Sequence, residues 1–256
     1  MLDFIWLIVI IQQFWGVVLF MSIYDMNKEV LNMKKIRIAI DGPAGAGKSS
    51  VSMLVAGSLG YSYVDTGAIY RGVAYAMGNR VKIENVDKIK DILKNFSVSF
   101  KMINGVNHIY LDNKDITAYI RSEKISMLAS SVSALSFVRS ALMELQKQFA
   151  RKGGVVMEGR DIGTVIMPDA ELKIFLSASL KNRAQRRLSD LEKKGVKLSL
   201  EKLVKEIEKR DKDDSQRKTA PLKQADDAVF IDNTDMDLTQ TAEFIVKKAK
   251  EIIGAH

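Results

Sequence analysis

One stretch of the chain reads Gly42-Pro43-Ala44-Gly45-Ala46-Gly47-Lys48-Ser49. It fits the pattern Gly-x4-Gly-Lys-Ser/Thr of a phosphate-binding loop, whose glycines let backbone amides turn inward around phosphate oxygens. The short apolar run at 36–40 precedes the loop, and a helix predicted over residues 48–59 follows it, which is the context that the pattern requires. We therefore expect Lys48 to reach the β- and γ-phosphates of a nucleotide and the Ser49 hydroxyl to hold Mg²⁺.

Apolar runs alternate with helical patterns along the rest of the chain. Runs typical of buried parallel strands occur at 63–64, 155–157, 172–176 and 229–231. Helical patterns begin near Ala68 and cover about 238–253, where Asp237 can cap the last helix. Strands that alternate with helices in this way predict an α/β fold with a doubly wound parallel sheet.

Residues 84–124 break this alternation. Apolar and polar residues alternate over 96–102, as in a half-buried strand. Asn104-Gly105 is a strong signal for a two-residue hairpin turn, and residues 108–111 return as the partner strand. The segment therefore predicts a small antiparallel β insert in the α/β domain.

The first 33 residues differ from the rest. Residues 4–24 form an uncharged run of 21 residues, which is long enough to span a bilayer, although the adjacent Gln12 and Gln13 weaken a spanning helix. Met33 reads as a natural start directly before the first strand. We therefore interpret residues 1–33 as a hydrophobic extension outside a domain at 34–256. Basic residues follow the run, so an anchor there would keep that domain in the cytoplasm.

The composition excludes several classes of chemistry. The chain has no cysteine, which excludes disulfides, thiolate metal sites and a cysteine nucleophile. It has two histidines: His108, which we expect on a strand surface rather than as a ligand, and His256, the last residue. A metal would be held mainly by oxygen, as Mg²⁺ or Ca²⁺ is. The net charge of +8 is typical of a protein with an anionic partner, which could be nucleic acid, a membrane surface or a phosphorylated small molecule, or of one whose charge serves solubility alone.

The chain lacks the two further motifs that identify GTPases among the phosphate-loop proteins. No Asp-x-x-Gly occurs, and Asn113-Lys114-Asp115 has its aspartate one place too early for the Asn-Lys-x-Asp of a GTPase. A mechanical ATPase would be longer. A small kinase with an acceptor pocket remains, and a pocket for a second phosphorylated substrate needs arginines that clamp anions.

These motifs together resemble the bacterial cytidylate kinases, in the family's order from about residue 34 to the C-terminus. The resemblance is carried by Asp41-Gly42-Pro43-Ala44-Gly45-Ala46-Gly47-Lys48-Ser49, Asp65-Thr66-Gly67-Ala68-Ile69-Tyr70-Arg71, Glu158-Gly159-Arg160-Asp161-Ile162-Gly163-Thr164, Lys173-Ile174-Phe175-Leu176 and Arg210-Asp211 through Ala220-Pro221-Leu222. Many kinases share the phosphate loop, whereas the tyrosine–arginine and arginine–aspartate motifs are far more specific. Glu158 stands where the family most often has aspartate, which keeps the carboxylate. The resemblance implies a P-loop kinase fold, with the insert at 84–124 as the monophosphate-side subdomain and an arginine-rich lid at about 180–195.

The resemblance also implies roles for individual residues. ATP is expected on the loop residues Gly42, Pro43, Ala44, Gly45, Ala46, Gly47, Lys48, Ser49 and Ser50. Catalysis by charge stabilisation is expected from Lys48, Arg160, Arg183 and Arg187, with Arg186 beside the last two in the lid. The monophosphate substrate is expected on Thr66, Arg71, Ser130, Arg139, Arg160, Asp161, Arg210, Asp214 and Arg217. Mg²⁺ is expected on Ser49, with Glu158 acting on the ion from behind its direct ligands.

The base reader follows from hydrogen-bonding chemistry. Cytosine presents an acceptor at N3 and a donor at N4, so its site needs one fixed donor and one fixed acceptor. Arg139 can donate and Asp161 can accept. Uracil reverses both positions and should fit poorly.

The sequence thus predicts ATP-dependent phosphorylation of CMP and dCMP to CDP and dCDP. We expect a cytoplasmic monomer that binds no nucleic acid, and that meets a membrane only if residues 4–24 form an anchor. One alternative is another small P-loop kinase, acting on UMP, AMP or a non-nucleotide alcohol. A rival of another class is a membrane-anchored, nucleotide-regulated protein that binds nucleic acid, which predicts salt-sensitive binding and no acceptor-dependent ADP release.

Overall fold

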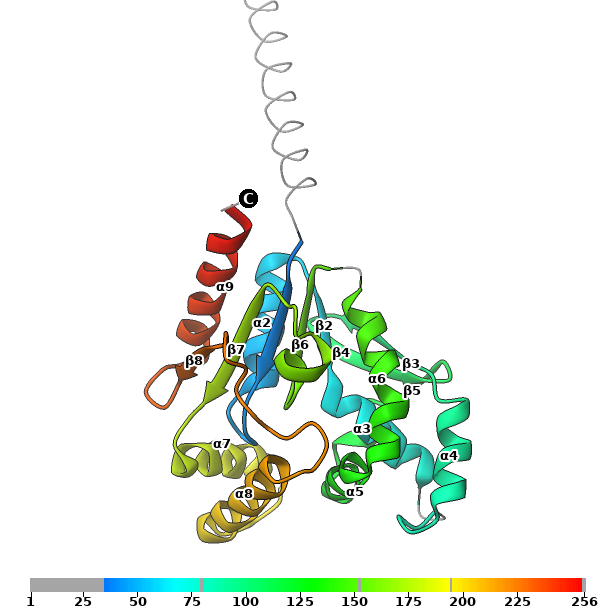
Figure 1. Ribbon diagram of the computed structural model, residues 1–256. Coiled ribbons are helices and arrows are strands. Elements are labelled where there is room, and N and C mark those ends of the chain that lie inside the picture. The colour runs from blue at the N-terminus through cyan, green and yellow to red at the C-terminus, as the bar shows by residue number, and fades with distance from the viewer. Residues whose placement is uncertain (1–34, 79–80, 152, 194, 255–256) are drawn as a thin grey trace, which may run out of the picture. The chain divides into compact units, whose positions relative to one another are not determined.

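The fold is shown in Figure 1, and the structure is a computed structural model that describes residues 35–78, 81–151, 153–193 and 195–254. The extension predicted at 1–33 lies outside the described residues. The strands are β1 (Arg37–Asp41), β2 (Ser62–Asp65), β3 (Val98–Ile103), β4 (Val106–Leu111), β5 (Lys114–Asp115), β6 (Val155–Gly159), β7 (Leu172–Ser177) and β8 (Val229–Asp232). The helices are α2 (Lys48–Leu59), α3 (Thr66–Met77), α4 (Val86–Lys94), α5 (Glu123–Ala134), α6 (Ser136–Ala150), α7 (Leu180–Glu192), α8 (Leu200–Ser215) and α9 (Leu238–Gly254), with short helical turns η1 (Tyr119–Arg121) and η2 (Ile162–Ile166).

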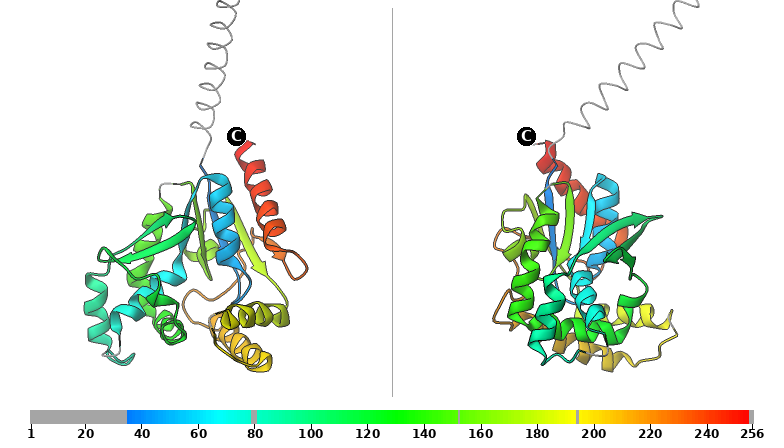
Figure 2. Two further views of the ribbon diagram at one scale, coloured as in Figure 1. Left: turned by 180° about the vertical axis from the view of Figure 1, so that it is seen from behind. Right: turned by 90° about the vertical axis from the view of Figure 1, so that its right-hand side faces the viewer.

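A parallel sheet of five strands forms the centre of the fold, in the order β2-β6-β1-β7-β8. The central strand β1 pairs with both β6 and β7. One face of the sheet packs on α2 and α9, which lie side by side (Figure 2), and apolar residues of α6 and η2 pack on the other. Helical elements therefore cover both faces, and the predicted doubly wound α/β fold is confirmed.

The direction of these strands determines where the site lies. The strands of the main sheet run parallel, so their carboxyl ends lie along one edge. The phosphate loop follows β1 at this edge, Thr66 follows β2 and Arg160 follows β6. Motifs that are far apart in the sequence are thereby collected along one line.

The antiparallel insert is present and contains more elements than predicted. β3 and β4 form the expected hairpin, in which Ile103 pairs with Val106. Asn104 and Gly105 have φ values of 50° and 74°, the two positive angles that a type I′ turn requires. The sequence analysis missed β5 and the helix α4. A second pair of positive φ angles, at Asp112 and Asn113, turns the chain from β4 into β5.

His108 lies on β4, as expected, and is half-buried. Its Nδ1 atom lies 2.6 Å from Oδ2 of Asp115 on β5, so its partner is a carboxylate of the neighbouring strand.

Within the described ranges, no single helix is long and apolar enough to cross a membrane. The pair α5 and α6 passes that test of length and composition only jointly, across a bend of 97°.

The backbone conformation of the hairpin turn can be tested at Gly105, with Gly57 in α2 as the control. Gly105→Ala should destabilise the fold by about 1 kcal/mol, because an alanine at this position must adopt a left-handed φ. The new Cβ meets no neighbouring atom, so the cost comes from the backbone alone. Gly57→Ala inside α2 also meets no neighbour, has no such φ and should stabilise the fold by roughly 0.5–1 kcal/mol. Urea unfolding of both variants measures the two free energies, and changes of the same sign would contradict this account.

Candidate active site

The phosphate loop is formed where β1 ends and α2 begins. Gly42 has φ 150°, and a Cβ there would lie 1.9 Å from the Leu176 carbonyl oxygen of β7, so only glycine fits. Gly47 is the N-cap of α2 in a left-handed conformation, and no side chain caps the helix. The first amides of α2 and the partial positive charge of its N-terminus are therefore directed at the loop, where they suit a phosphate.

Lys48 opens α2 and is buried beneath the loop. Its Nζ donates to the Pro43 carbonyl oxygen at 2.7 Å. Burial, followed by the positive charge of Arg160 and then of Arg210, lowers the pKa of Lys48, while the carboxylate of Glu158 opposes that shift. An anion placed among these groups would favour the charged lysine.

Arginines from separate parts of the chain meet in front of the loop. Arg210 is exposed as a whole residue, but the crowded surroundings of its guanidinium group and then the nearby charge of Arg160 lower its pKa to about 10. Arg71 and Arg187 add to that repulsion, whereas Asp214 opposes it. Arg71, Arg160 and Arg187 thus all lie within electrostatic reach of Arg210. Such a cluster is suited to a phosphate dianion.

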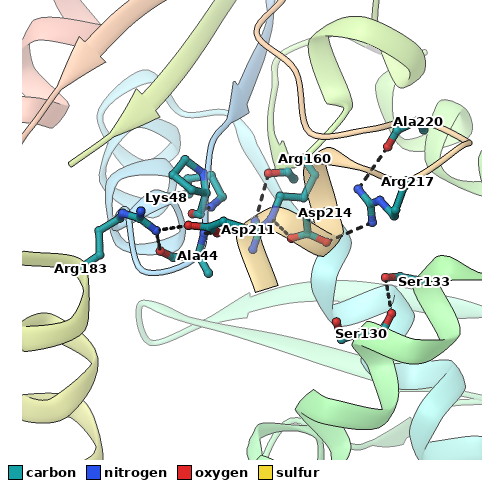
Figure 3. Close-up of polar contacts among 12 residues, drawn as sticks. Ala44, Lys48, Ser130, Ser133, Arg160, Arg183, Asp211, Asp214, Arg217 and Ala220 are labelled. Atoms are coloured by element: carbon teal, nitrogen blue, oxygen red, sulfur yellow. Dashed lines mark hydrogen bonds and ion pairs between the residues drawn. The ribbon is translucent and has the colours of Figure 1, made fainter. Parts of the chain in front are cut away.

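Asp214 organises part of this cluster (Figure 3). Its Oδ2 accepts from Arg160 Nε at 2.8 Å, and its Oδ1 lies 3.4 Å from Arg217 Nη1. Burial raises the pKa of Asp214, but Arg160 and Arg217 outweigh it, and the net shift is downward. The carboxyl group is therefore ionised and holds both guanidinium groups in place.

Arg139 and Asp161 form a buried pair. Arg139 on α6 donates from Nη2 to Asp161 Oδ2 at 2.5 Å and from Nη1 to the Ser133 carbonyl oxygen at 3.2 Å. The guanidinium carbon lies 5.4 Å from the centre of the Tyr70 ring. The two predicted base readers, which are 22 residues apart in sequence, are thus neighbours with fixed orientations.

The turn that carries Asp161 is held by Asp41, the last residue of β1. Asp41 accepts from the backbone N–H groups of Ile162 and Gly163 at 2.9 and 2.7 Å. Burial raises the pKa of Asp41 to about 6, and these two donors oppose the shift. Asp41 entered the sequence prediction only as part of a motif, and its side chain positions the turn after Asp161 next to the phosphate loop.

Two of the predicted base contacts have other partners. The Thr66 hydroxyl donates to the Glu158 carbonyl oxygen at 2.7 Å and is buried there. Ser130 lies on α5, where its carbonyl oxygen accepts from Ser133 Oγ at 2.8 Å (Figure 3).

The two residues predicted for Mg²⁺ are adjacent. The Ser49 side chain hydrogen-bonds to Glu158, which also accepts from the Tyr63 hydroxyl. Burial and then Asp65 raise the pKa of Glu158, whereas Lys48 and Ser49 oppose the shift. In the part of the chain that the structure describes, no three histidine, cysteine or acidic side chains form a metal site. A few oxygens beside a phosphate site nevertheless fit Mg²⁺, which keeps water and phosphate as most of its ligands.

The lid arginines on α7 differ in their surroundings. Arg183 is buried and donates to the carbonyl oxygens of Ala44 and Ala178 and to Asp211. Arg186 donates to Asn233 at the end of β8. Arg187 is half-buried, with 37% of its side chain exposed, and pairs with Glu123 at 2.9 Å.

Asp211 and Asn233 were not recognised as site residues from the sequence. The Asn233 side chain donates to the Ala46 carbonyl oxygen at 3.1 Å and so supports the phosphate loop. Asp211 accepts from the Ala44 backbone N–H. Its spacing of three residues from Asp214 on α8, which puts both on one helical face, is the signal that could have found it.

Comparison with known proteins agrees with this geometry. The cytidylate kinase family matches residues 38–251. The chain is 44% identical to the cytidylate kinase of Caldicellulosiruptor saccharolyticus over 87% of this chain and 99% of that protein. It is 47% identical to the cytidylate kinase of Streptococcus thermophilus over 86% of this chain and 99% of that protein. A shikimate kinase structure from Bacteroides thetaiotaomicron aligns over 86% of this chain and 99% of that one at 14% identity and a TM-score of 0.42, too low to support an argument. The match along nearly the whole described domain shows that the chain belongs to the cytidylate kinase family.

Proposed function

We propose that the protein transfers the γ-phosphoryl group of ATP to CMP and dCMP, which gives ADP and CDP or dCDP. The observation that carries this proposal is the buried Arg139–Asp161 pair beside a cluster of phosphate-binding arginines. The pair presents one donor and one acceptor, as the cytosine edge requires. The family membership of the chain supports the same acceptor.

Adenine sets the sharpest competing hypothesis. Its N1 acceptor and N6 donor repeat the pattern of cytosine, so the Arg139–Asp161 pair alone disfavours UMP but not AMP. Coupled ADP release with CMP, dCMP, UMP and AMP tests the proposal. We expect CMP and dCMP to be the best acceptors, and AMP or UMP in their place would overturn it.

The reaction needs positioning and charge stabilisation rather than a general base. The attacking atom is a phosphate oxygen of CMP, which is already ionised, so the lack of a histidine in the site is no obstacle. Lys48, which now donates to Pro43, would turn to the phosphates of ATP. When bound with ATP at Ser49, Mg²⁺ would offset negative charge on the β- and γ-phosphates.

Most of the residues that would place the acceptor already have a charged partner. Arg71, which bonds Asp65 at 2.5 Å, Arg160, which bonds Asp214 at 2.8 Å, and Arg210, which is exposed, would hold the monophosphate or the nearby ribose. Asp214 would accept from the ribose hydroxyls. Arg217, whose Nε is buried with no hydrogen-bond partner in the structure, would complete its bonding at the nucleotide.

The remaining assignments are parts of the same proposal. The insert at 84–124 is the monophosphate-side subdomain, and residues 180–195 are the lid that excludes water from ATP. The protein acts as a cytoplasmic monomer and binds no nucleic acid.

The lowered pKa of Lys48 gives a testable pH dependence. Because its pKa lies below that of an ordinary lysine, the free enzyme loses this cation as pH rises, and ATP affinity should fall between pH 7.5 and about 9.5. Lys48→Arg should remove this decline, since arginine keeps its charge throughout. Titration calorimetry measures the affinities. A decline of equal size in both proteins would assign it to another group.

Removal of Lys48 should separate catalysis from folding. Lys48→Ala should keep a cooperative thermal transition and lose about 10²- to 10³-fold in kcat, as when one preorganised donor is removed. Near-normal turnover by a folded Lys48→Ala protein would contradict the phosphate-loop assignment.

Substitutions of Asp161 and of Arg71 should have different effects on the selectivity for CMP over UMP. Asp161→Ala leaves the cytosine amine unpaired, so kcat/KM for CMP should fall by about 10- to 150-fold, much more than for UMP. Arg71→Ala should weaken CMP and UMP alike, because a phosphate carries no base identity. The isosteric Asp161→Asn serves if the alanine variant unfolds, and equal losses on both substrates would make Asp161 a purely structural carboxylate.

The N-terminal extension can be tested separately. A chain that begins at Met33 should stay in the soluble fraction and keep full activity, because every motif of the site follows Met33. Loss of folding would place residues 1–32 in the domain. Resistance of the full chain to alkaline extraction from membranes would favour an anchor at 4–24.

A further inference from the structure

Asp211 joins the phosphate loop to the lid. Its Oδ1 accepts from the Ala44 backbone N–H at 2.9 Å, and its Oδ2 accepts from Arg183 Nη1 at 2.5 Å. Arg183 Nη1 in turn donates to the Ala44 carbonyl oxygen at 2.8 Å. One carboxylate and one guanidinium group therefore bond to both polar groups of a single loop residue.

Arg183 is buried in this joint, and Asp211 is half-buried. Arg183 also donates from Nε to the Ala178 carbonyl oxygen at 3.0 Å, where β7 leads into α7. A Cβ on Gly45 would lie 3.0 Å from the Arg183 carbonyl oxygen, so the loop and α7 are in direct contact. Charged hydrogen bonds that are shielded from water hold their geometry well. The loop, α7 and α8 are fastened together at one point.

The same helix reaches the acceptor side. Asp214 lies three residues after Asp211 on α8 and holds Arg160 and Arg217, and Arg210 precedes Asp211 directly (Figure 3). Residues three apart share a helical face. A single α8 therefore carries contacts to both the acceptor pocket and the phosphate loop.

We propose that Asp211 is a positioning residue that couples the two substrate sites. A monophosphate that binds Arg160, Arg210 and Asp214 sets the position of α8. Asp211 on α8 then fixes the position of the Ala44 amide. Its bond to Arg183 fixes the position of the start of α7. Occupation of the acceptor pocket then prepares the loop for ATP, and ATP prepares the acceptor pocket by the same factor, because coupling of two binding equilibria is reciprocal. This inference rests on the proposed function.

The proposal is tested by measuring the coupling factor. This factor is the dissociation constant of a non-hydrolysable ATP analogue in the absence of CMP divided by its value at saturating CMP, and Mg²⁺ is present in both measurements. We expect the full chain to give a factor of about 5 or more, within the usual range of such couplings. In Asp211→Asn, which keeps the shape but removes the charge, the factor should fall toward 1, and KM for ATP at saturating CMP should rise. Asp213→Asn, the same change at an exposed position of α8, should leave the factor unchanged.

A merely structural role would produce a different result. It would lower the thermal midpoint and weaken both substrates alike with the coupling factor intact, and that outcome would overturn the proposal. Arg183→Lys keeps the charge but loses the forked contact, and it probes the joint from the other side if Asp211→Asn does not fold. A factor of 1 in the unmodified protein, with CMP bound and phosphorylated, would refute the coupling alone. Failure of CMP to bind at all would instead refute the proposed function.

Discussion

Buried guanidinium groups at the carboxyl edge of a parallel sheet set the main physical constraint on this protein. An unpaired buried charge costs several kcal/mol, so an arginine that is buried at this edge needs a partner before any substrate arrives. Asp161 pairs with Arg139, Asp211 with Arg183 and Asp214 with Arg160. Desolvation is the first cause that lowers the pKa of Lys48 and of Arg210, and the positive charge of Arg160 is the second. A phosphate bound among these groups would favour their charged forms.

Local patterns predicted the parts of the fold that depend on local chemistry. The phosphate loop, the strands of the main sheet and the Asn104-Gly105 hairpin each have a short signature in the sequence, and each is present. β5 was missed because a strand of two residues has no periodicity, and its turn at Asp112-Asn113 contains no glycine. The helix α4 was missed because it lies in a segment interpreted as purely antiparallel, although Asn85 caps it through the Lys88 N–H.

The site illustrates the same distinction at the level of side chains. Sequence order and family motifs placed Arg139 and Asp161 together, and the structure joins them directly. Sequence order and motifs could not reveal which hydrogen-bond partner each side chain has in the absence of substrate. Thr66 is the clearest example, because its hydroxyl donates to the Glu158 carbonyl oxygen, a partner fixed by the pairing of β2 with β6. Asp211 was hidden for a related reason, since its partner Ala44 is 167 residues away and contributes only backbone atoms.

The lid arginines divide into two kinds for energetic reasons. Arg183 is buried and has three acceptors, so bringing it to a phosphate would require all three bonds to break in a site shielded from water. Arg187 is more exposed than Arg183, and among the bonds seen in the described residues it pairs only with the exposed Glu123. Such surface pairs contribute about 0–1 kcal/mol, so Arg187 can leave its partner at little cost. Arg183 and Arg187 lie four residues apart on α7. Arg183 is suited to fix α7 to the loop, and Arg187 is suited to change its partner.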